Sequence, residues 1–381
     1  MKKKKILLVT ERRADYTKLR PILQEISKSK KLEYKLVVTG SHLLKEYGHT
    51  IDEIKNDGFK ITTTFAMFKK QRKDSGAEMT RMFGQTIVKL SDIIEKIKPD
   101  LILSGFDIGG NFAAAIIGAH MNIVVAHFEG GEVTGTIDES IRHATTKFSH
   151  IHFTSNEDAT KRLIKMGENP KYVYTVGNTS LDGIKKIKNI SKSVLEKKYN
   201  IDLTKPLLVI LQHTVTSEIK NVEKNIINTI NAVKESNYQS IMIYGNADAG
   251  SQKIINIIKN SNIKQYETIP YQDYINLLKY ASALIGNSSS GIIEAPFLHI
   301  PSINIGTRQN GRLRSDSIID VSYTKKEIKN AIEKAISDKK FQKKVMICKN
   351  KYGDGTASRK IIEVLESIDL KNIPIQKKMM Y

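Results

Sequence analysis

The chain has 381 residues, of which 40% are hydrophobic, so it can bury a sizeable core and global disorder is not expected. Lysine and arginine outnumber the acids by 61 to 40, which gives a formal net charge of +21. The lysines are scattered rather than clustered between aromatic residues, so we expect an anionic small-molecule substrate and no nucleic acid.

The sequence predicts neither a signal peptide nor a membrane segment. The apolar run at residues 6–9 is too short for a signal-peptide core. Polar residues interrupt the uncharged stretch at residues 108–128, and an alanine-rich helix followed by a β-branched strand explains it better than a membrane span. The single cysteine, Cys348, excludes an internal disulfide framework and fits a reducing compartment. We therefore expect a cytoplasmic protein with no membrane partner.

Short apolar runs that end in small or polar residues alternate with stretches of helical period, a pattern typical of parallel strands joined by helices. In the first half, strands are predicted at 5–10, 34–40, 100–105, 122–128 and 150–155, with helices at 16–27 and 86–97. A second series predicts strands at 207–213, 240–245, 283–290 and 301–307, with helices at 222–236 and 290–299. The fold class is therefore α/β, with two doubly wound Rossmann-like domains that face each other across a cleft.

Ligands of open α/β sheets bind beyond the carboxyl ends of the strands, which directs attention to polar strand ends. The selected segments are residues 10–16, 104–111, 128–132, 211–218, 244–251 and 285–296. In the last of them, a predicted helix begins with Ser288, Ser289, Ser290 and Gly291, whose backbone N–H groups could cradle a diphosphate. The alternative is ordinary capping of the helix by a serine, but capping needs only one serine and this segment has three. Glu294, on the first turn, could accept hydrogen bonds from the hydroxyls of a ribose.

Basic residues follow the first strand and the last strand of the second series, where guanidinium groups match phosphate geometry. They are Arg12, Arg13, Lys18, Arg308, Arg312 and Arg314. Tyr271, after Pro270, is either a core aromatic residue or a stacking partner for a base.

Carboxylates gather after two strands of the first half. Asp107 and Glu129 stand at strand ends, and the Gly130-Gly131 pair would let a substrate approach the backbone. Asp138 is four residues before Arg142 on one helical face, which suggests an ion pair, while Glu139 completes a capping box. The histidines lack metal-ligand spacing, so we expect no metal and assign Asp107, Glu129 and Asp138 to proton transfer. His213 is either structural or a catalytic group from the other domain.

Several segments, in matching order over nearly the whole chain, resemble the hydrolysing UDP-N-acetylglucosamine 2-epimerases of sialic acid synthesis. They are "RADYTKLRPIL", "TGSHLLKEYGHT", "EGGEVTGTIDESIRHATTKFSH", "LQHTVTSEIK", "GNADAGS", "GNSSSGIIEAP", "NIGTRQNGR" and "YGDGTASRKI". The resemblance implies a glycosyltransferase-B-like fold whose C-terminal helix returns to the first domain. We assign residues 1–180 to the catalytic domain, 181–355 to the nucleotide-binding domain, and 356–381 to the returning helix and tail.

The resemblance also implies a reaction. UDP leaves C1 anti to removal of the C2 proton, water adds syn to the resulting 2-acetamidoglucal, and N-acetylmannosamine is released, without a metal or redox cofactor. It implies catalytic roles for Asp107, Glu129, Asp138 and His213. It implies binding roles for Arg13, Lys18, Arg142, Tyr271, Ser288, Ser289, Ser290, Gly291, Glu294 and Arg308. The resemblance further implies a homodimer or a homotetramer, since relatives form one or the other.

One segment departs from the pattern that the resemblance suggests. Family members usually read Gly-Asp-Arg-Phe-Asp or Gly-Asp-Arg-Phe-Glu around the first acid, whereas this chain has "GFDIGGN", with Ile108 and Gly110 in place of the arginine and the second acid. Thr214 replaces a proline. These changes leave open a UDP- or GDP-linked 2,4-diacetamido-2,4,6-trideoxyglucose substrate, as in legionaminic acid synthesis. Two alternatives from other functional classes also stay open: a glycosyltransferase and a non-catalytic nucleotide-sugar-binding protein.

Overall fold

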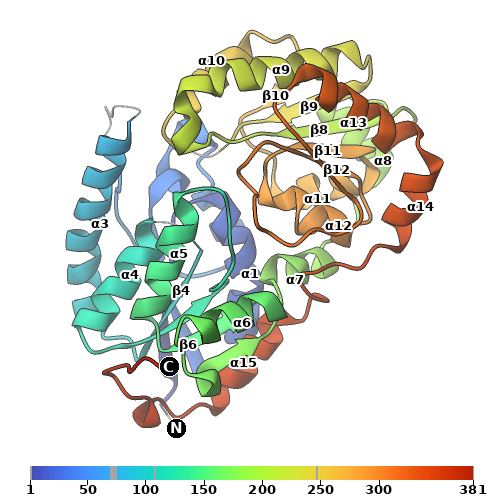
Figure 1. Cartoon of the computed structure of the whole chain (residues 1–381). Coiled ribbons are helices and arrows are strands. Elements are labelled where there is room, and N and C mark those ends of the chain that lie inside the picture. Colours follow the sequence, from blue (N-terminus) through green and yellow to red (C-terminus); the bar gives the residue numbers. More distant parts are fainter. Residues whose placement is uncertain (1, 69–74, 107–108, 246–247, 381) are drawn as a thin grey trace. The chain divides into compact units, whose positions relative to one another are not determined.

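The structure is a computed structural model that describes residues 2–68, 75–106, 109–245 and 248–380 (Figure 1). The chain divides into two compact units. The first consists of Met1–Glu132, Ile137–Lys185 and Tyr352–Tyr381, and the second of Val133–Thr136 and Lys186–Lys351. Asp107 lies outside the described residues, as does its neighbour Ile108.

The first unit contains a parallel sheet with the strand order β3-β2-β1-β4-β5-β6-β7. Its strands are β1 Lys4–Thr10, β2 Leu32–Val38, β3 Ile61–Thr64, β4 Leu101–Gly105, β5 Val124–Phe128, β6 Ile151–Thr154 and β7 Val173–Thr175. The strand order reverses between β1 and β4, so the carboxyl ends of these strands flank the place where such sheets bind ligands.

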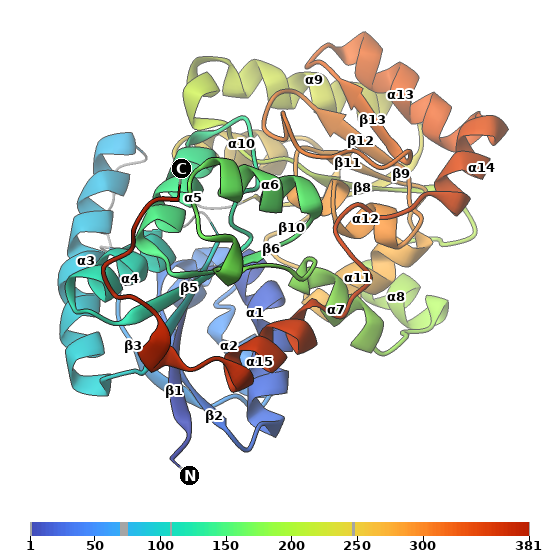
Figure 2. The ribbon, with the colours of Figure 1, turned by 60° about the horizontal axis from the view of Figure 1, so that its bottom comes forward.

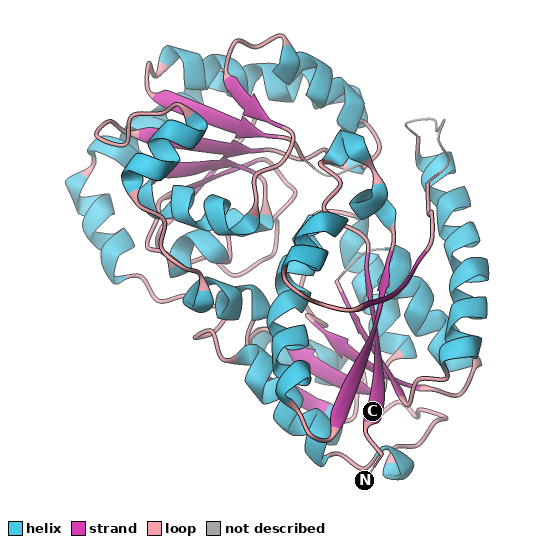
Figure 3. Cartoon of the chain, turned by 180° about the vertical axis from the view of Figure 1, so that it is seen from behind, coloured by secondary structure: helices cyan, strands magenta, loops and turns pink. Residues whose placement is uncertain are grey.

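Helices cover both faces of this sheet (Figure 3). They are α1 Arg13–Lys28, α2 Ile51–Asn56, α3 Gly76–Ile97, α4 Gly109–His120, α5 Ile137–Phe148, α6 Glu157–Lys165, α7 Thr179–Lys186 and α15 Ala357–Ser367. Alternate residues of β1 enter different cores: Ile6 and Leu8 pack toward α1 and α15, whereas Leu7 and Val9 pack toward α3 and α4. Burial on both faces explains why these strands read as continuous apolar runs.

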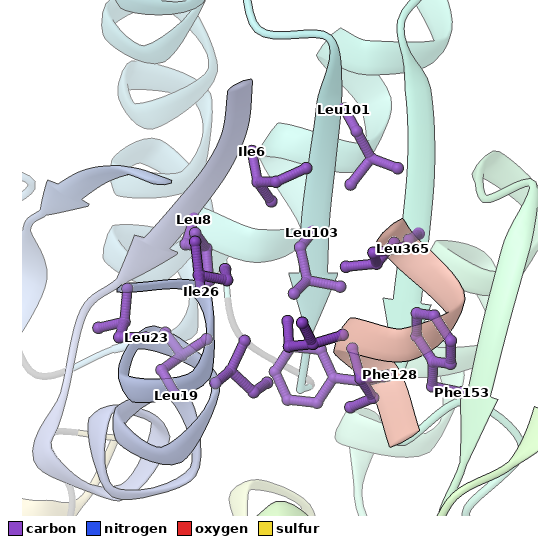
Figure 4. Close-up of a cluster of buried hydrophobic side chains, with 14 of the residues drawn as sticks. Ile6, Leu8, Leu19, Leu23, Ile26, Leu101, Leu103, Phe128, Phe153 and Leu365 are labelled. Carbon is purple, nitrogen blue, oxygen red and sulfur yellow. The ribbon is translucent and has the colours of Figure 1, made fainter. Parts of the chain in front are cut away.

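The C-terminal residues pack on the first unit. Leu365 of α15 joins the core formed by β1, β4 and α1 (Figure 4). Asp182 caps α15, because its Oδ2 and Oδ1 accept hydrogen bonds from Ala357 N at 3.0 Å and Ser358 N at 2.7 Å. The tail then continues to α5 (Figure 2), where Lys377 Nζ donates to Thr146 O and Ser149 O at 2.8 Å each.

The second unit has the same construction, with a parallel sheet of order β10-β9-β8-β11-β12-β13. Its strands are β8 Leu207–Leu211, β9 Gln239–Ile243, β10 Lys264–Tyr266, β11 Ala283–Gly286, β12 Ser302–Ile305 and β13 Ile318–Val321. Its helices are α8 Lys192–Tyr199, α9 Val222–Glu235, α10 Ser251–Lys259, α11 Tyr271–Tyr280, α12 Glu294–Phe297, α13 Lys325–Ser337 and α14 Lys339–Ile347. The order reverses between β8 and β11.

The predicted fold class of two Rossmann-like units is confirmed, with two differences in detail. The outermost strands of both sheets, β3, β7, β10 and β13, were not predicted, because they are short and only partly buried. The helix predicted at 290–299 is wrong. The chain forms a 3₁₀ turn at Ser289–Gly291 and then the short α12, which includes Pro296 in its first turn, where a missing N–H costs no intrahelical hydrogen bond.

The stretch at 108–128 contains α4 followed by β5, as predicted. Among the described residues, no helix combines the length and the apolar character that a bilayer span requires.

Candidate active site

Glu129 of the first unit is held through both of its carboxylate oxygens. It follows β5 with a left-handed φ of +63°, its N–H donates to Phe153 O at 2.9 Å, and its side chain is only 6% exposed. Lys18 Nζ lies 2.7 Å from Oε2, and Asn178 Nδ2 donates to Oε1 at 2.6 Å. One oxygen therefore faces a cation and the other faces an amide, which sets the plane of the carboxylate.

Lys18 comes from α1 and is itself held against the sheet. Its Nζ lies 5.1 Å from the centroid of the Phe106 ring, a cation–π arrangement beside the ion pair. Lys18 was predicted as a phosphate ligand. That role stays a prediction; in the structure Lys18 pairs with Glu129, across 111 residues of sequence.

The turn between β1 and α1 is closed by Asp15. Its Oδ2 accepts from Glu11 N at 2.8 Å and its Oδ1 from Arg12 N at 2.9 Å. Burial raises the pKa of Asp15 to about 6, although the Arg12 charge and the backbone donors act in the opposite direction. Asp15 thereby fixes the start of α1, where Arg13 is the first residue.

The ends of β1 and β4 are joined by Glu11 and Asn111, which lie inside segments selected from the sequence but were not named as site residues. Gly110 N, at the start of α4, donates to Glu11 Oε2 at 2.7 Å. Asn111 accepts from Gly105 N and donates to Val9 O, each at 3.1 Å. Asp107 belongs to this connection in sequence, but it lies outside the described residues, so its predicted role stays a prediction.

The glycines after Glu129 are required by the chain itself. Gly131 has a φ of +79°, and a Cβ there would lie 2.4 Å from Ala159 O of α6. A Cβ on Gly130 would lie 3.0 Å from His127 Nδ1. Close packing of the loop is therefore an intramolecular reason for both glycines, and their predicted role in substrate approach stays a prediction.

Arg142 of α5 supports the same loop. Its side chain is buried, and Nη1 donates to Glu132 O at 2.8 Å, while Glu132 Oε1 accepts from Asn156 Nδ2 at 2.5 Å. Asp138 lies in the first turn of α5 and is half-buried. The Asp138–Arg142 ion pair and the direct contact of either residue with substrate stay predictions.

In the second unit, Asn287 organises the ends of β8 and β11. Its Oδ1 accepts from His213 N at 2.7 Å and its Nδ2 donates to His213 O at 2.9 Å. The backbone oxygen of Asn287 accepts from Gln309 Nε2 at 2.8 Å and from Arg308 Nη1 at 3.2 Å. His213, Arg308 and the serine turn are thus brought together around one buried amide.

The serine turn shows ordinary capping, the simpler of the two interpretations, and its role as a diphosphate cradle stays a prediction. Ser288 Oγ accepts from Ser290 N at 3.2 Å, which is capping, and Ser290 Oγ lies 2.7 Å from Tyr274 OH. A Cβ on Gly291 would lie 2.4 Å from Ser302 Oγ. Ser288 and Ser289 are half-buried. Because the turn leads into a very short helix, any anion would depend on local N–H groups more than on a helix dipole.

Two further predicted binding residues, Glu294 and Tyr271, each begin a helix of the second unit. Glu294 is the first residue of α12 and Tyr271 the first of α11, and both side chains are buried. The burial of Tyr271 agrees with a core aromatic residue and leaves its contact with a base as a prediction.

A short connection between β5 and α5 belongs to the second unit, which the sequence did not indicate. Gly135 N donates to Arg308 O at 3.1 Å, and Arg312 Nε donates to Val133 O at 3.2 Å. A Cβ on Gly135 would lie 2.1 Å from Thr307 O. Residues 133–136 therefore pack on the loop that carries Arg308 and Arg312.

Asn178 is the residue of this site that sequence analysis missed most clearly. It follows β7, whose three residues were too few to be recognised as a strand, so its polar end was not selected. Asn287 lay inside a selected segment but was passed over in favour of the serines. Within the described ranges, His, Cys, Asp and Glu form no group of three that could hold a metal ion.

Comparison with known proteins identifies relatives along the whole chain. A family model described as UDP-N-acetylglucosamine 2-epimerase matches residues 24–366. The chain is 33% identical over 378 residues to the UDP-N,N'-diacetylbacillosamine 2-epimerase (hydrolyzing) of Legionella pneumophila, covering 98% of both chains. It is 34% identical over 381 residues to a UDP-N-acetylglucosamine 2-epimerase of Neisseria meningitidis, again covering 98% of both.

A solved structure shares the fold. The UDP-GlcNAc 2-epimerase from Neisseria meningitidis bound to UDP-GlcNAc superimposes with a TM-score of 0.80 and 22% identity, covering 97% of this chain and 100% of that chain.

Proposed function

Because the chain belongs to the UDP-N-acetylglucosamine 2-epimerase family, we propose that it is a hydrolysing 2-epimerase that converts UDP-N-acetylglucosamine and water to N-acetylmannosamine and UDP. The observation that carries this proposal is the fixed Glu129 carboxylate between Lys18 and Asn178. A group that transfers a proton to or from carbon must be held in a defined orientation, and this carboxylate is.

The proposed reaction moves one proton at a time. A base removes the C2 proton, the C2–H electron pair forms the C1–C2 double bond, and the C1–O bond breaks with departure of UDP. Water then adds a hydroxyl to C1 and a proton returns to C2 from the opposite face, which inverts that carbon. We propose that Asp107, Glu129 and Asp138 carry these proton transfers with His213.

The departing diphosphate needs donors, and the second unit supplies candidates. We propose that Ser288, Ser289, Ser290 and Gly291 hold it together with Arg308, that Glu294 binds the ribose, and that Tyr271 contacts the base. Arg13, Lys18 and Arg142 would serve the substrate from the first unit. The reaction has no net oxidation or reduction, so we propose that it uses no redox cofactor, and we extend the proposal to the absence of a metal.

A second substrate is favoured by the relatives. A protein named for UDP-N,N'-diacetylbacillosamine is as similar to this chain as one named for UDP-N-acetylglucosamine. The same elimination and hydration at C1 and C2 could act on a UDP- or GDP-linked 2,4-diacetamido-2,4,6-trideoxyglucose, since C4 and C6 take no part. The product would feed legionaminic acid synthesis rather than sialic acid synthesis.

The test is an NMR product assay of the purified full chain in D₂O, without added metal, on both classes of nucleotide sugar. We expect UDP, free N-acetylmannosamine and deuterium at C2 from UDP-N-acetylglucosamine. Turnover of the diacetamido sugar alone would select the second substrate. Folded protein that binds UDP but forms neither product would overturn both and favour a binding protein. Light scattering on the same sample tests the proposed homodimer or homotetramer.

A further inference from the structure

Asn178 contacts the candidate catalytic carboxylate, and the proposed function gives Asn178 no role in the reaction itself. Its side chain is 2% exposed, and Nδ2 donates to Glu129 Oε1 at 2.6 Å. Its Oδ1 accepts from Ser180 N at 3.0 Å and from Ser180 Oγ at 2.8 Å. Because these donors need the oxygen of the amide, the nitrogen must face Glu129, and the orientation of the amide is determined.

The backbone of Asn178 is fixed by a distant part of the chain. Asn178 N donates to Tyr352 O at 2.7 Å, and Tyr352 is buried. Gly177 and Gly353 have φ of +100° and +111°, and a Cβ on Gly353 would lie 3.0 Å from the Cα of Gly177. The two segments therefore meet through glycines that no other residue could replace without strain.

This meeting point adjoins two places where the chain passes from one unit to the other. Tyr352 is the first residue of the first unit after the passage at Lys351, and α7, which begins directly after Asn178, ends at the passage between Lys185 and Lys186. Asp182 of α7 also caps α15, the helix that follows Tyr352. The residue that holds Glu129 is thus part of the structure that anchors both connecting segments.

We propose that Asn178 is a positioning residue for Glu129: it holds Oε1, leaves Oε2 to Lys18, and ties the orientation of the carboxylate to the connecting segments. This inference rests on the proposed function, in which Glu129 transfers a proton. A carboxylate held only at Oε2 can rotate about its last torsion, which has a broad energy profile. Small misplacements of a reacting group cost roughly 100-fold in rate, so the second contact matters for turnover.

The test compares Asn178→Ala with Asn304→Ala in the full chain. Asn304 is a matched control, because it is also buried and its Nδ2 donates to a carboxylate, Asp320 Oδ1, at the same 2.6 Å. We expect Asn178→Ala to lower kcat by about 10- to 100-fold with little change in KM. The acidic limb of its pH–rate profile should move to higher pH, because a hydrogen bond to the ionised carboxylate is lost. Asn304→Ala should keep the wild-type profile.

A second variant covers the case in which Asn178→Ala does not fold. Ser180→Ala keeps Asn178 but removes one of the donors that orient its amide, and it should lower kcat in the same direction by a smaller factor. The proposal would be overturned if Asn178→Ala and Ser180→Ala both kept the wild-type kcat and pH profile. It would also be overturned if Asn178→Ala and Asn304→Ala lowered kcat by the same factor.

A readout without turnover separates this inference from the proposed function. In protein with ¹³C-labelled glutamate, the Glu129 signal is identified by its absence in Glu129→Gln. Its titration midpoint should move to higher pH in Asn178→Ala, and an unchanged midpoint would refute the positioning role. If the wild-type protein turned over neither nucleotide sugar, the proposed function would fail, while this titration would still decide on Asn178.

Discussion

The two units hold their candidate functional residues in different ways, although in both units these residues follow the carboxyl ends of parallel strands. In the first unit, the reactive group itself is held: Glu129 contacts Lys18 and Asn178 through its side chain. In the second, Asn287 holds the backbone of His213 through both N and O. Substitutions that remove a charge should therefore impair the first unit's site. Substitutions that remove side-chain hydrogen bonds to the backbone should impair the second unit's site.

Glu129→Gln should have the largest effect, because it removes a proton-transferring group and keeps its shape. We expect kcat to fall by about 10²- to 10⁴-fold, with the affinity for UDP unchanged within about twofold. The measurements are the NMR product assay and calorimetric titration with UDP.

Glu132→Gln is the matched control for that variant. Glu132 lies in the same loop and is also 6% exposed, and its Oε1 accepts a hydrogen bond from Asn156, which caps α6. We expect this change to affect stability more than turnover. Equal losses of kcat in the two variants would show that the loop, and not the Glu129 carboxylate, is what turnover requires.

The next largest expected difference between the two units is the loss of stability at low pH. The first unit buries His42, His127 and His152, and burial lowers the pKa of each, to about 3 for His42 and well below 6.5 for His127. Because the unfolded chain takes up protons at these residues below about pH 6.5 and the folded unit does not, stability is lost as pH falls through that value. For His42, at pH 5.5, this costs about 1 kcal/mol of folding free energy.

Hydrogen exchange at pH 7.5 and 5.5 measures this difference. Protection of β1, β5 and β6 should fall at the lower pH, while β8 and β11 of the second unit, whose histidines are His213 and His299, should change less. His42→Gln should flatten the pH dependence of the first unit. Equal loss of protection in both units would contradict the assignment of acid sensitivity to these histidines.

Asn287→Ala should weaken the second unit's site without touching a proposed proton-transferring carboxylate. The change removes a buried amide that bridges β8 and β11, which costs about 1–3 kcal/mol of folding free energy. It also frees the backbone of His213, so we expect UDP affinity to fall about tenfold, equivalent to about 1.4 kcal/mol. Isothermal titration with UDP and thermal unfolding measure the two effects.

Asn276→Ala is the control in the same unit. Asn276 is as buried as Asn287 and bonds to backbone groups of Lys188, Ile190 and Gln272. It should lose similar stability and keep the wild-type affinity for UDP. A parallel loss of affinity would mean that any destabilisation of the second unit, and not the support of His213, weakens the nucleotide site.

The inner strands could be predicted because burial leaves a local apolar signal, and strand-end position then selects candidate site residues whose roles stay predictions. Glu129 could be selected because a buried apolar run ends at it and glycines follow. Lys18 was also a candidate, but its pairing with Glu129 could not be predicted, because the two residues are 111 positions apart. Asn178 was missed because β7 has only three residues and is partly exposed, so its apolar run is too short to be recognised as a strand. The predicted helix at 290–299 failed because the chain forms a 3₁₀ turn at Ser289–Gly291 before the short α12 begins, and the apolar pattern gives no sign of this break.

The smallest expected effect is at Glu11. Here a charged side chain of the first unit holds a backbone N–H group, so both kinds of contact occur together. The carboxylate accepts from the backbone N–H of Gly110 at 2.7 Å, at the positive end of the α4 dipole. A Cβ on Gly110 would lie 3.0 Å from the same oxygen, so a larger side chain at that position and the Glu11 contact compete for space. Gly110 is also one of the positions where, by the resemblance described above, this chain has a residue that is unusual in the family.

Glu11→Gln should therefore cost only about 0.3–1 kcal/mol of folding free energy, measured by chemical denaturation, because the amide oxygen can still accept the hydrogen bond while the charge–dipole interaction is lost. Gly110→Ala should cost more, since it displaces the carboxylate. If the Glu11–Gly110 contact shapes the sugar pocket, both variants should change the ratio of kcat/KM between UDP-N-acetylglucosamine and its diacetamido counterpart, and Glu25→Gln, on the same helix as Lys18, should not. A constant ratio in both variants would restrict Glu11 to stabilising the start of α4.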